Sequence, residues 1–236
     1  MKLSEAIEIA GIDAVEIAVE PWTWPFAQAR RVDIDRHFAA RQREQPALWN
    51  GRMLMLHRYA RENGVLRGAS FETDYASFLA WHDWGSPAVG VFNVFAAAAL
   101  QSADGAFLFG QMAPFTAAAG RWVFPGGMPE PNDITSAGML DLADNVGREL
   151  FEETGLDIGV CQVEPGWTLV GDGGFVALMK HVRVNESAER LRTNIMDHLA
   201  DEAQPEFTAV RIVRTPADVD PATPRVFVKY LMARLS

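Results

Sequence analysis

The sequence predicts an α/β (α+β) fold in which a mixed β-sheet carries helices on both faces, preceded by an N-terminal α+β extension. Strand-like apolar runs dominate the first half of the chain, whereas strand and helix patterns alternate in the second half. The chain has 236 residues, 49% of them hydrophobic, which is enough to bury a sizeable core. Turn residues near Gly85 and Pro87 predict a boundary between the extension, residues 1–86, and a second domain, residues 87–236.

The N-terminal extension is expected to contain both strands and helices. Residues 13–20 alternate like a strand, and residues 32–46 space their apolar side chains like an amphipathic helix that ends before Pro46. Two strand-like runs lie within residues 50–74, on either side of the turn-forming segment RENG. Residues 75–87 then predict a short helix that glycine and proline terminate.

The second domain is expected to begin with a buried strand in the apolar run VGVFNVFAAAAL, residues 89–100, which is too short to span a bilayer. A turn ending in Gly105 joins it to a second strand, and the segment RWVF predicts a third that ends at Pro125. Further along the chain, the pattern predicts a helix over residues 142–155, a hairpin over residues 168–184, a helix over residues 186–203 and a strand over residues 207–214. The hairpin turn is GDGG, which lacks the spacing of a phosphate-binding loop.

Composition excludes several classes of partner and compartment. The net charge of -10 argues against non-specific nucleic-acid binding, because that needs a basic surface. The acidic N-terminal segment lacks the features of a signal peptide, and no apolar run predicts a membrane span. Cys161 is the only cysteine, so an intrachain disulfide is excluded and a reducing compartment is favoured, with the cytoplasm as the expected location.

The segment RELFEETGL, residues 148–156, contains three glutamates on a predicted helix. At about 100° per residue, Glu149, Glu152 and Glu153 share an arc of roughly 100°. Arg148 can reach Glu152 at i+4. Carboxylates on a rigid helix suit hard divalent cations such as Mg²⁺ or Mn²⁺, which in turn bind phosphate oxygens. The alternative is a solvated acidic helix face.

This segment resembles the second half of the Nudix box, Arg-Glu-aliphatic-x-Glu-Glu-x-Gly-aliphatic, and every fixed position matches. The segment WVFPGG, residues 122–127, is similar to the approach to that box in many members of the family. The resemblance implies a Nudix αβα sandwich around a mixed sheet. It also implies a hydrolase in which Mg²⁺ or Mn²⁺ is held by Glu149, Glu152 and Glu153, with Glu149 as ligand or general base and Arg148 as their orienting partner.

The chain departs from the family pattern in the first half of the box. Ile134 and Leu140 stand where the pattern, counted back from Arg148, has a glycine and a glutamate. Counting forward from Gly127 instead places Asp133 at the glutamate position and leaves seven extra residues before the arginine. We therefore expect an insertion here, with the box glutamate either missing or replaced by Asp133 or Asp141. Asp133 is the better candidate for a further metal ligand, because Asp141 is expected mainly to cap the helix.

Other residues near the motif have candidate roles. Gly126 and Gly127 would let the backbone approach substrate phosphates. Arg121 is a candidate phosphate ligand or an exposed arginine at a strand edge, whereas Trp122 is expected to pack in the core. Some members of the family supply a further catalytic glutamate after the second helix, and Glu202 and Glu206 are the candidates for that role here. The histidines show no metal-ligand spacing.

The expected partner is a small phosphate-containing substrate. It would be a nucleoside diphosphate linked to another moiety, as in a nucleotide sugar or ADP-ribose. Hydrolysis of coenzyme A at its diphosphate is an alternative. An alternative of another class is a Nudix-fold module that senses a nucleotide without cleaving it, motivated by the altered first half of the box. The sequence does not define the oligomeric state, and a homodimer stays open.

Overall fold

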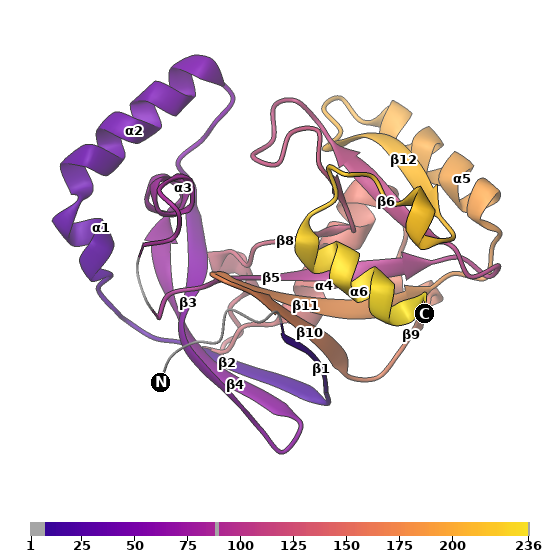
Figure 1. The fold of residues 1–236 in the computed structure, drawn as a ribbon, viewed down its shortest axis with the longest axis horizontal. Coiled ribbons are helices and arrows are strands. Elements are labelled where there is room, and N and C mark those ends of the chain that lie inside the picture. The colour runs from indigo at the N-terminus through magenta and orange to yellow at the C-terminus, as the bar shows by residue number, and fades with distance from the viewer. Residues whose placement is uncertain (1–7, 88–89, 236) are drawn as a thin grey trace.

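A computed structural model describes residues 8–87 and 90–235, which form two β-sheets with helices packed around them (Figure 1). The larger sheet has the strand order β1-β10-β11-β5-β6-β12, with the short strands β7, β8 and β9 attached to β6, β5 and β11. The smaller sheet has the order β2-β4-β3. The acidic N-terminal segment, which is not expected to be a signal peptide, lies partly outside the described residues. The first residue of the apolar run at 89–100 also lies outside them.

The strands have the following bounds: β1 Glu8–Ile12, β2 Ala14–Val19, β3 Arg52–Glu62, β4 Val65–Asp74, β5 Asn93–Gln101, β6 Phe107–Met112, β7 Trp122–Val123, β8 Gly126–Gly127, β9 Gln162–Val163, β10 Trp167–Asp172, β11 Phe175–Arg183 and β12 Phe207–Val213. The helices are α1 Pro25–Ala29, α2 Arg31–Glu44, α3 Tyr75–Asp83, α4 Leu142–Thr154, α5 Ala188–Asp201 and α6 Arg225–Arg234. Every helix and strand expected from the sequence is present, whereas β1, α1, α6 and the two-residue strands β8 and β9 were not predicted.

The larger sheet is mixed. Strand β11 pairs in parallel with β5 and antiparallel with β10, and β12 pairs antiparallel with β6. The turn between β10 and β11 contains Gly173 at a φ of 61°, a conformation that glycine adopts without strain, so GDGG is a hairpin turn as predicted. The parallel pair β5–β11 is buried and apolar on both faces, as expected for a central strand pair.

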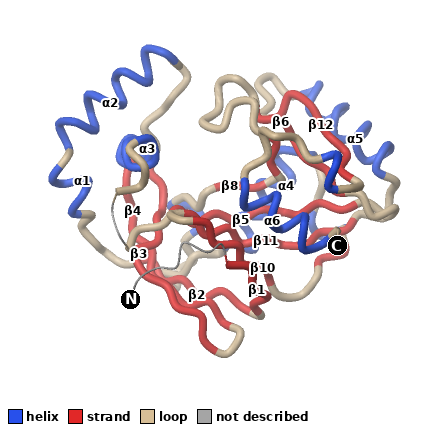
Figure 2. The backbone as a smooth tube through the Cα atoms, in the orientation of Figure 1, coloured by secondary structure: helices blue, strands red, loops and turns tan. Residues whose placement is uncertain are grey.

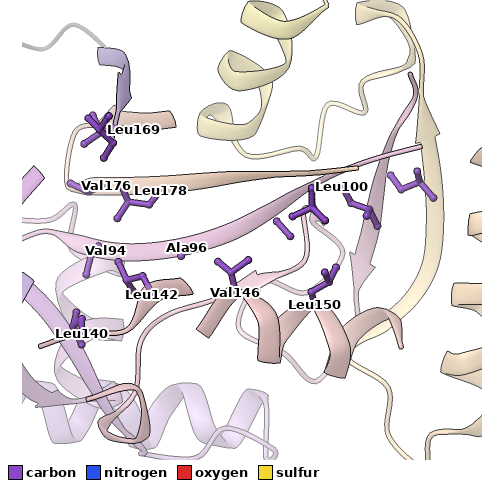
Figure 3. Packing of buried hydrophobic residues seen from close by; sticks show 14 of the residues in the cluster. Val94, Ala96, Leu100, Leu140, Leu142, Val146, Leu150, Leu169, Val176 and Leu178 are labelled. Atoms are coloured by element: carbon purple, nitrogen blue, oxygen red, sulfur yellow. The ribbon is translucent and has the colours of Figure 1, made fainter. Parts of the chain in front are cut away.

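Helices cover both faces of this sheet, which confirms the predicted fold class (Figure 2). Val146 and Leu150 of α4 belong to the same core as Val94 and Leu178 of β5 and β11, and α5 joins this core. Figure 3 shows Val146 and Leu150 pointing from α4 toward the strands. Alternate residues of β5 and β11 face the second core, which α6 covers.

The N-terminal part of the chain contributes to both sheets. Strand β1 pairs with β10, with Ile12 opposite Trp167, and so forms an edge of the larger sheet. The smaller sheet packs with α3 around an aromatic core that includes Trp24, Phe71 and Trp81. Across residues 8–87 and 90–235, no helix has both the length and the apolar character needed to cross a membrane. The division at residue 86 stays a prediction.

Candidate functional site

Helix α4 has well-defined ends that fix its position against the sheet. The Asp141 side chain accepts a hydrogen bond from the backbone N–H of Asp144 at 3.0 Å, so Asp141 caps the helix as predicted. Gly155 ends it in the left-handed conformation, at a φ of 73°, and its N–H donates to Phe151 O at 2.8 Å. With Val146 and Leu150 fully buried between these ends, the opposite side of α4 is held in a fixed orientation.

Replacing Asp141 with alanine should lower the free energy of unfolding by about 1 kcal/mol, because the first turn loses its side-chain cap. Activity should be largely kept, since this carboxylate is used at the helix end. Thermal or urea unfolding measures the cost, and Asp141→Asn, which retains a capping oxygen, is the matched control. A large loss of activity without a loss of stability would assign Asp141 to the site instead.

The glycine turn of β8 lies directly against two glutamates of α4. The backbone N–H of Gly126 donates to Glu153 Oε2 at 2.8 Å. At Gly127, a Cβ atom would lie only 2.5 Å from Glu149 Oε1, so any larger residue here would displace the Glu149 carboxylate. The turn is itself held by β5, with Ala97 opposite Gly126 and Ala96 opposite Gly127. The two glutamates are therefore enclosed by backbone.

The three glutamates differ in solvent exposure. Only Glu152 is exposed as a solvated acidic helix face would require. The side chain of Glu149 is 16% exposed and that of Glu152 is 56% exposed. Glu153 is 4% exposed. Buried carboxylates are uncommon unless they are paired or bind a cation. Two of the three predicted ligands thus lie inside the protein.

Arg148 is the positive group of this cluster. It contacts Glu149 Oε1 at 2.9 Å, Glu152 Oε2 at 3.0 Å and Asp133 Oδ1 at 3.3 Å. One guanidinium therefore connects three carboxylates, including the i+4 contact with Glu152 that the sequence predicts. This arrangement orients Glu149 and Glu152 on the surface of α4.

Negative charge at the site exceeds what Arg148 offsets. Burial raises the pKa of Glu149 to about 7, Arg148 opposes this, and Glu152 and Glu206 add to it. Burial also raises the pKa of Glu153 well above its ordinary value, against the hydrogen bond from Gly126. Carboxylates whose ionised form is disfavoured by burial and by one another gain from a bound cation. As the side chains stand in residues 8–87 and 90–235, no group of three or more His, Cys, Asp or Glu is arranged to hold a metal ion.

Asp133 is the last residue of the short 3-10 helix Pro131–Asp133, and its carboxylate contacts Arg148. Its side chain is 2% exposed and accepts hydrogen bonds from Glu130 N at 2.8 Å, Asn145 Nδ2 at 3.1 Å and Arg148 Nη2 at 3.3 Å. Both carboxylate oxygens are thus in use by protein donors. The structure connects Asp133 to the predicted ligands through Arg148, and its role as a metal ligand stays a prediction.

The inserted residues form a small loop that pairs with the smaller sheet. Ile134 and Leu140 form an isolated bridge that closes the loop. Its Leu140 N–H donates to Ile17 O at 2.9 Å, and Val19 N–H donates to Gly138 O at 2.8 Å. The loop therefore connects β2 to the N-terminus of α4.

The remaining candidates lie on separate elements. Arg121 is exposed immediately before β7, and its role in phosphate binding stays a prediction. Trp122 is buried in the core beneath α6, with Arg211 Cζ 4.7 Å from its ring centroid, so it packs as expected. Glu202 pairs with His198 at 3.2 Å. Glu206 is exposed at the surface; desolvation by the surrounding protein and the charges of Glu152 and Glu202 raise its pKa, so Glu206 lies near the carboxylate cluster.

Comparison with known proteins gives structural likeness only. No family model matches the chain, and no curated protein matches it. A solved structure described as a MutT protein from Methanosarcina mazei Go1 is 18% identical, with a TM-score of 0.42 over 60% of this chain and 91% of that chain. The Nudix hydrolase RenU from M. smegmatis is 16% identical, with a TM-score of 0.39 over 61% of this chain and 87% of that chain.

A third structure, a bifunctional NMN adenylyltransferase/ADP ribose pyrophosphatase from Francisella tularensis, is 15% identical with a TM-score of 0.39. The match covers 67% of this chain and 46% of the Francisella tularensis chain.

Proposed function

We propose that this chain is a metal-dependent hydrolase that cleaves the diphosphate linkage of a nucleoside diphosphate joined to another moiety, such as a nucleotide sugar or ADP-ribose. The observation that carries the proposal is the enclosure of Glu149 and Glu153 between α4 and the glycine turn of β8, with Arg148 as their shared positive partner. A solvated helix face would not bury two carboxylates against backbone.

The donor set fits a hard divalent cation. Glu149, Glu152 and Glu153 would hold Mg²⁺ or Mn²⁺, since carboxylate oxygens are the ligands that these ions prefer. Such an ion, when bound, supplies Lewis-acid polarisation of phosphoryl oxygens and activation of water. A cation would also offset the mutual repulsion of the carboxylates that raises their pKa values.

The chain's own groups have complementary roles in this proposal. Arg148 contacts both Glu149 and Glu152 and so orients their side chains on the helix. Asp133 contacts the same guanidinium and so holds Arg148 in place. With a pKa raised to about 7 by burial, Glu149 suits proton transfer near neutral pH and is the candidate general base. The exposed Arg121 and the backbone of Gly126 and Gly127 are the candidate substrate contacts.

Glu206 is a further candidate from outside the motif. After burial, the charge of Glu206 is one of the causes that raise the pKa values of Glu149 and Glu153, which supports a role near them. Glu202, by contrast, is engaged with His198 on the second helix. We therefore propose Glu206 rather than Glu202 as the additional carboxylate at the site.

A hydrolysis screen with Mg²⁺ and with Mn²⁺ tests the function. Its substrates are nucleoside diphosphate sugars, ADP-ribose, dinucleotides, coenzyme A and nucleoside triphosphates, and release of phosphate-containing products is measured. We expect metal-dependent turnover of at least one diphosphate-linked substrate, with coenzyme A as the alternative. Calorimetric binding of a nucleotide with no turnover under any condition would favour the non-hydrolytic sensor.

Although Asp133 is predicted from the sequence as a metal ligand, we infer that it acts through Arg148, because both of its carboxylate oxygens already accept hydrogen bonds. The variants Asp133→Asn and Asp133→Ala separate the two roles. The side-chain oxygen of asparagine can still accept the hydrogen bond from Glu130 N, whereas alanine leaves buried donors unpaired. The free energy of unfolding in urea should therefore be about 1–3 kcal/mol lower for the alanine variant than for the asparagine variant. Turnover at saturating Mg²⁺ should fall in both variants, with little change in the Mg²⁺ concentration for half-maximal rate. A rise in that concentration of about tenfold or more, at full turnover, would make Asp133 a ligand instead.

A further inference from the structure

Trp49, between α2 and β3, is a tryptophan whose ring is open to solvent. It is 80% exposed, whereas tryptophans in folded proteins are on average largely covered. Within the described residues the next most exposed tryptophan, Trp22, is 36% exposed and stacks on His57 with 4.8 Å between ring centroids. One edge of the Trp49 ring lies against Gly51, where a Cβ atom would be 2.5 Å from Trp49 Cζ3. The remaining ring surface is available to a ligand.

The backbone on both sides of Trp49 is held by hydrogen bonds. Gln42 Nε2 donates to Leu48 O at 2.9 Å, and the Leu48 side chain is buried. Asn50 Oδ1 accepts a hydrogen bond from Ala76 N, in the first turn of α3, at 2.7 Å. The exposed ring is therefore carried on a fixed segment. An aromatic surface that is already fixed loses little conformational entropy when a ligand stacks on it.

The segment between α2 and β3 meets the surroundings of the candidate hydrolytic site at its first end. Gln45 Nε2 donates to Thr116 O at 2.9 Å, in the loop between β6 and β7 (Figure 1). That loop begins beside the additional carboxylate of the site, because Ala113 N–H donates to Glu206 O at 2.7 Å. It ends at Arg121, the candidate phosphate contact.

The second end of the segment meets the chain that follows the glycine turn. Leu54 N–H, in the first half of β3, donates to Pro129 O at 3.0 Å, and Pro129 stands two positions after Gly127. Trp49 lies between the two attachments, four positions after the first and five before the second. The N-terminal part of the chain thus presents this ring beside the loops that border the site.

The polar groups next to Trp49 already have partners. Arg52 forms an ion pair with Glu72 of the neighbouring strand β4, and the Asn50 side-chain oxygen is used at α3. What remains is an uncharged aromatic surface. A nucleobase suits such a surface, because every base has a π face that can stack on an aromatic side chain. Phosphate groups would instead be drawn to Arg121 and the proposed metal ion.

We infer that Trp49 stacks on the nucleobase of the substrate and so makes the N-terminal part of the chain a determinant of specificity. This inference rests on the proposed function, which supplies a substrate that contains a base. The phosphates would lie toward Gly126 and Gly127, and the base toward Trp49.

Calorimetric titration of the full chain with AMP, UMP and ribose 5-phosphate, in the presence of Mg²⁺, tests the inference. Ribose 5-phosphate carries the same phosphorylated sugar without a base. Trp49→Ala should weaken the binding of AMP, UMP or both about tenfold or more, and should leave the affinity for ribose 5-phosphate unchanged. Trp49→Phe, which keeps an aromatic face, should stay within about threefold of the unmodified chain.

Val32→Ala is the matched control, because Val32 is a 71% exposed apolar side chain on α2 and should leave all affinities unchanged. Urea unfolding should be the same in every variant, since each changed side chain is exposed. An unaltered nucleotide affinity in Trp49→Ala, or an equal loss for ribose 5-phosphate, would overturn the inference. So would the absence of AMP and UMP binding to the unmodified chain.

Failure of this inference and failure of the proposed function give different results. Turnover in the hydrolysis screen, together with an unaltered nucleotide affinity in Trp49→Ala, would overturn the stacking role and leave the hydrolase in place. Nucleotide binding that depends on Trp49, without turnover of any substrate, would support the stacking role and favour the non-hydrolytic sensor.

Discussion

Glu153→Gln is expected to lower turnover at saturating Mg²⁺ by a factor of about 10² or more, because the buried carboxylate that we propose as a metal ligand loses its charge. Glutamine has nearly the same shape, and its side-chain oxygen can still accept the hydrogen bond from Gly126 N. Without metal, stability should stay the same or rise, because a buried carboxylate repelled by Glu149 and Glu206 is neutralised. Steady-state kinetics across a Mg²⁺ series and urea unfolding measure the two effects.

The matched control is Asp144→Asn, on the exposed side of the same helix, which should leave turnover unchanged. Activity near that of the unmodified chain in Glu153→Gln would remove this residue from the site. A fall in activity accompanied by a comparable loss of stability would mean that Glu153 serves to hold α4 against β8 and has no chemical role.

Helix α4 was predictable because the sequence signals that define it are local. Val146 and Leu150 recur at the helical period, Asp141 stands at the capping position and Gly155 at the end. The spacing of Glu149, Glu152 and Glu153 places them on one side of the helix regardless of the rest of the fold. The i+4 contact between Arg148 and Glu152 follows from the same geometry.

Contacts between distant segments could not be predicted from spacing. The burial of Glu153 depends on Gly126, 27 positions earlier in the chain, and on the pairing of β8 with β5. The sequence offered a choice between Asp133 and Asp141 in the first half of the box. The choice depends on whether the inserted residues fold back, which they do by pairing with β2.

Two missed elements illustrate different limits. Helix α6 has a readable pattern, with Val226, Phe227, Tyr230 and Leu231 buried at helical spacing after Pro224, so its signal was available in the sequence. Strand β1 is short, and its five residues are mostly exposed, so that no alternation marks it. Its position is set by pairing with β10, far along the chain. The domain boundary expected at residue 86 did not take the pairing of β1 with β10 into account.

The two glycines of β8 should have separable roles. A Cβ at Gly126 would overlap Ala96 O and lie 2.5 Å from Ala97 Cα, both backbone atoms of a central strand that cannot move aside. Gly126→Ala should therefore cost about 2–3 kcal/mol of stability in urea unfolding. A Cβ at Gly127 would instead meet the end of the Glu149 side chain, which can rotate away. Gly127→Ala should thus cost less than about 1 kcal/mol but lower turnover by about 10²-fold, because the carboxylate leaves its position.

Gly171→Ala is the matched control, because Gly171 also lies in a strand of the larger sheet and a Cβ there would be 3.8 Å from Glu8 Cβ, an ordinary contact. It should change neither stability nor turnover by a measurable amount. If Gly127→Ala keeps full turnover, Glu149 can act from a displaced position and its contact with the turn is incidental. Equal losses of stability in Gly126→Ala and Gly127→Ala would show instead that Glu149 is held too firmly by Arg148 to yield, and that the strain is absorbed by β8.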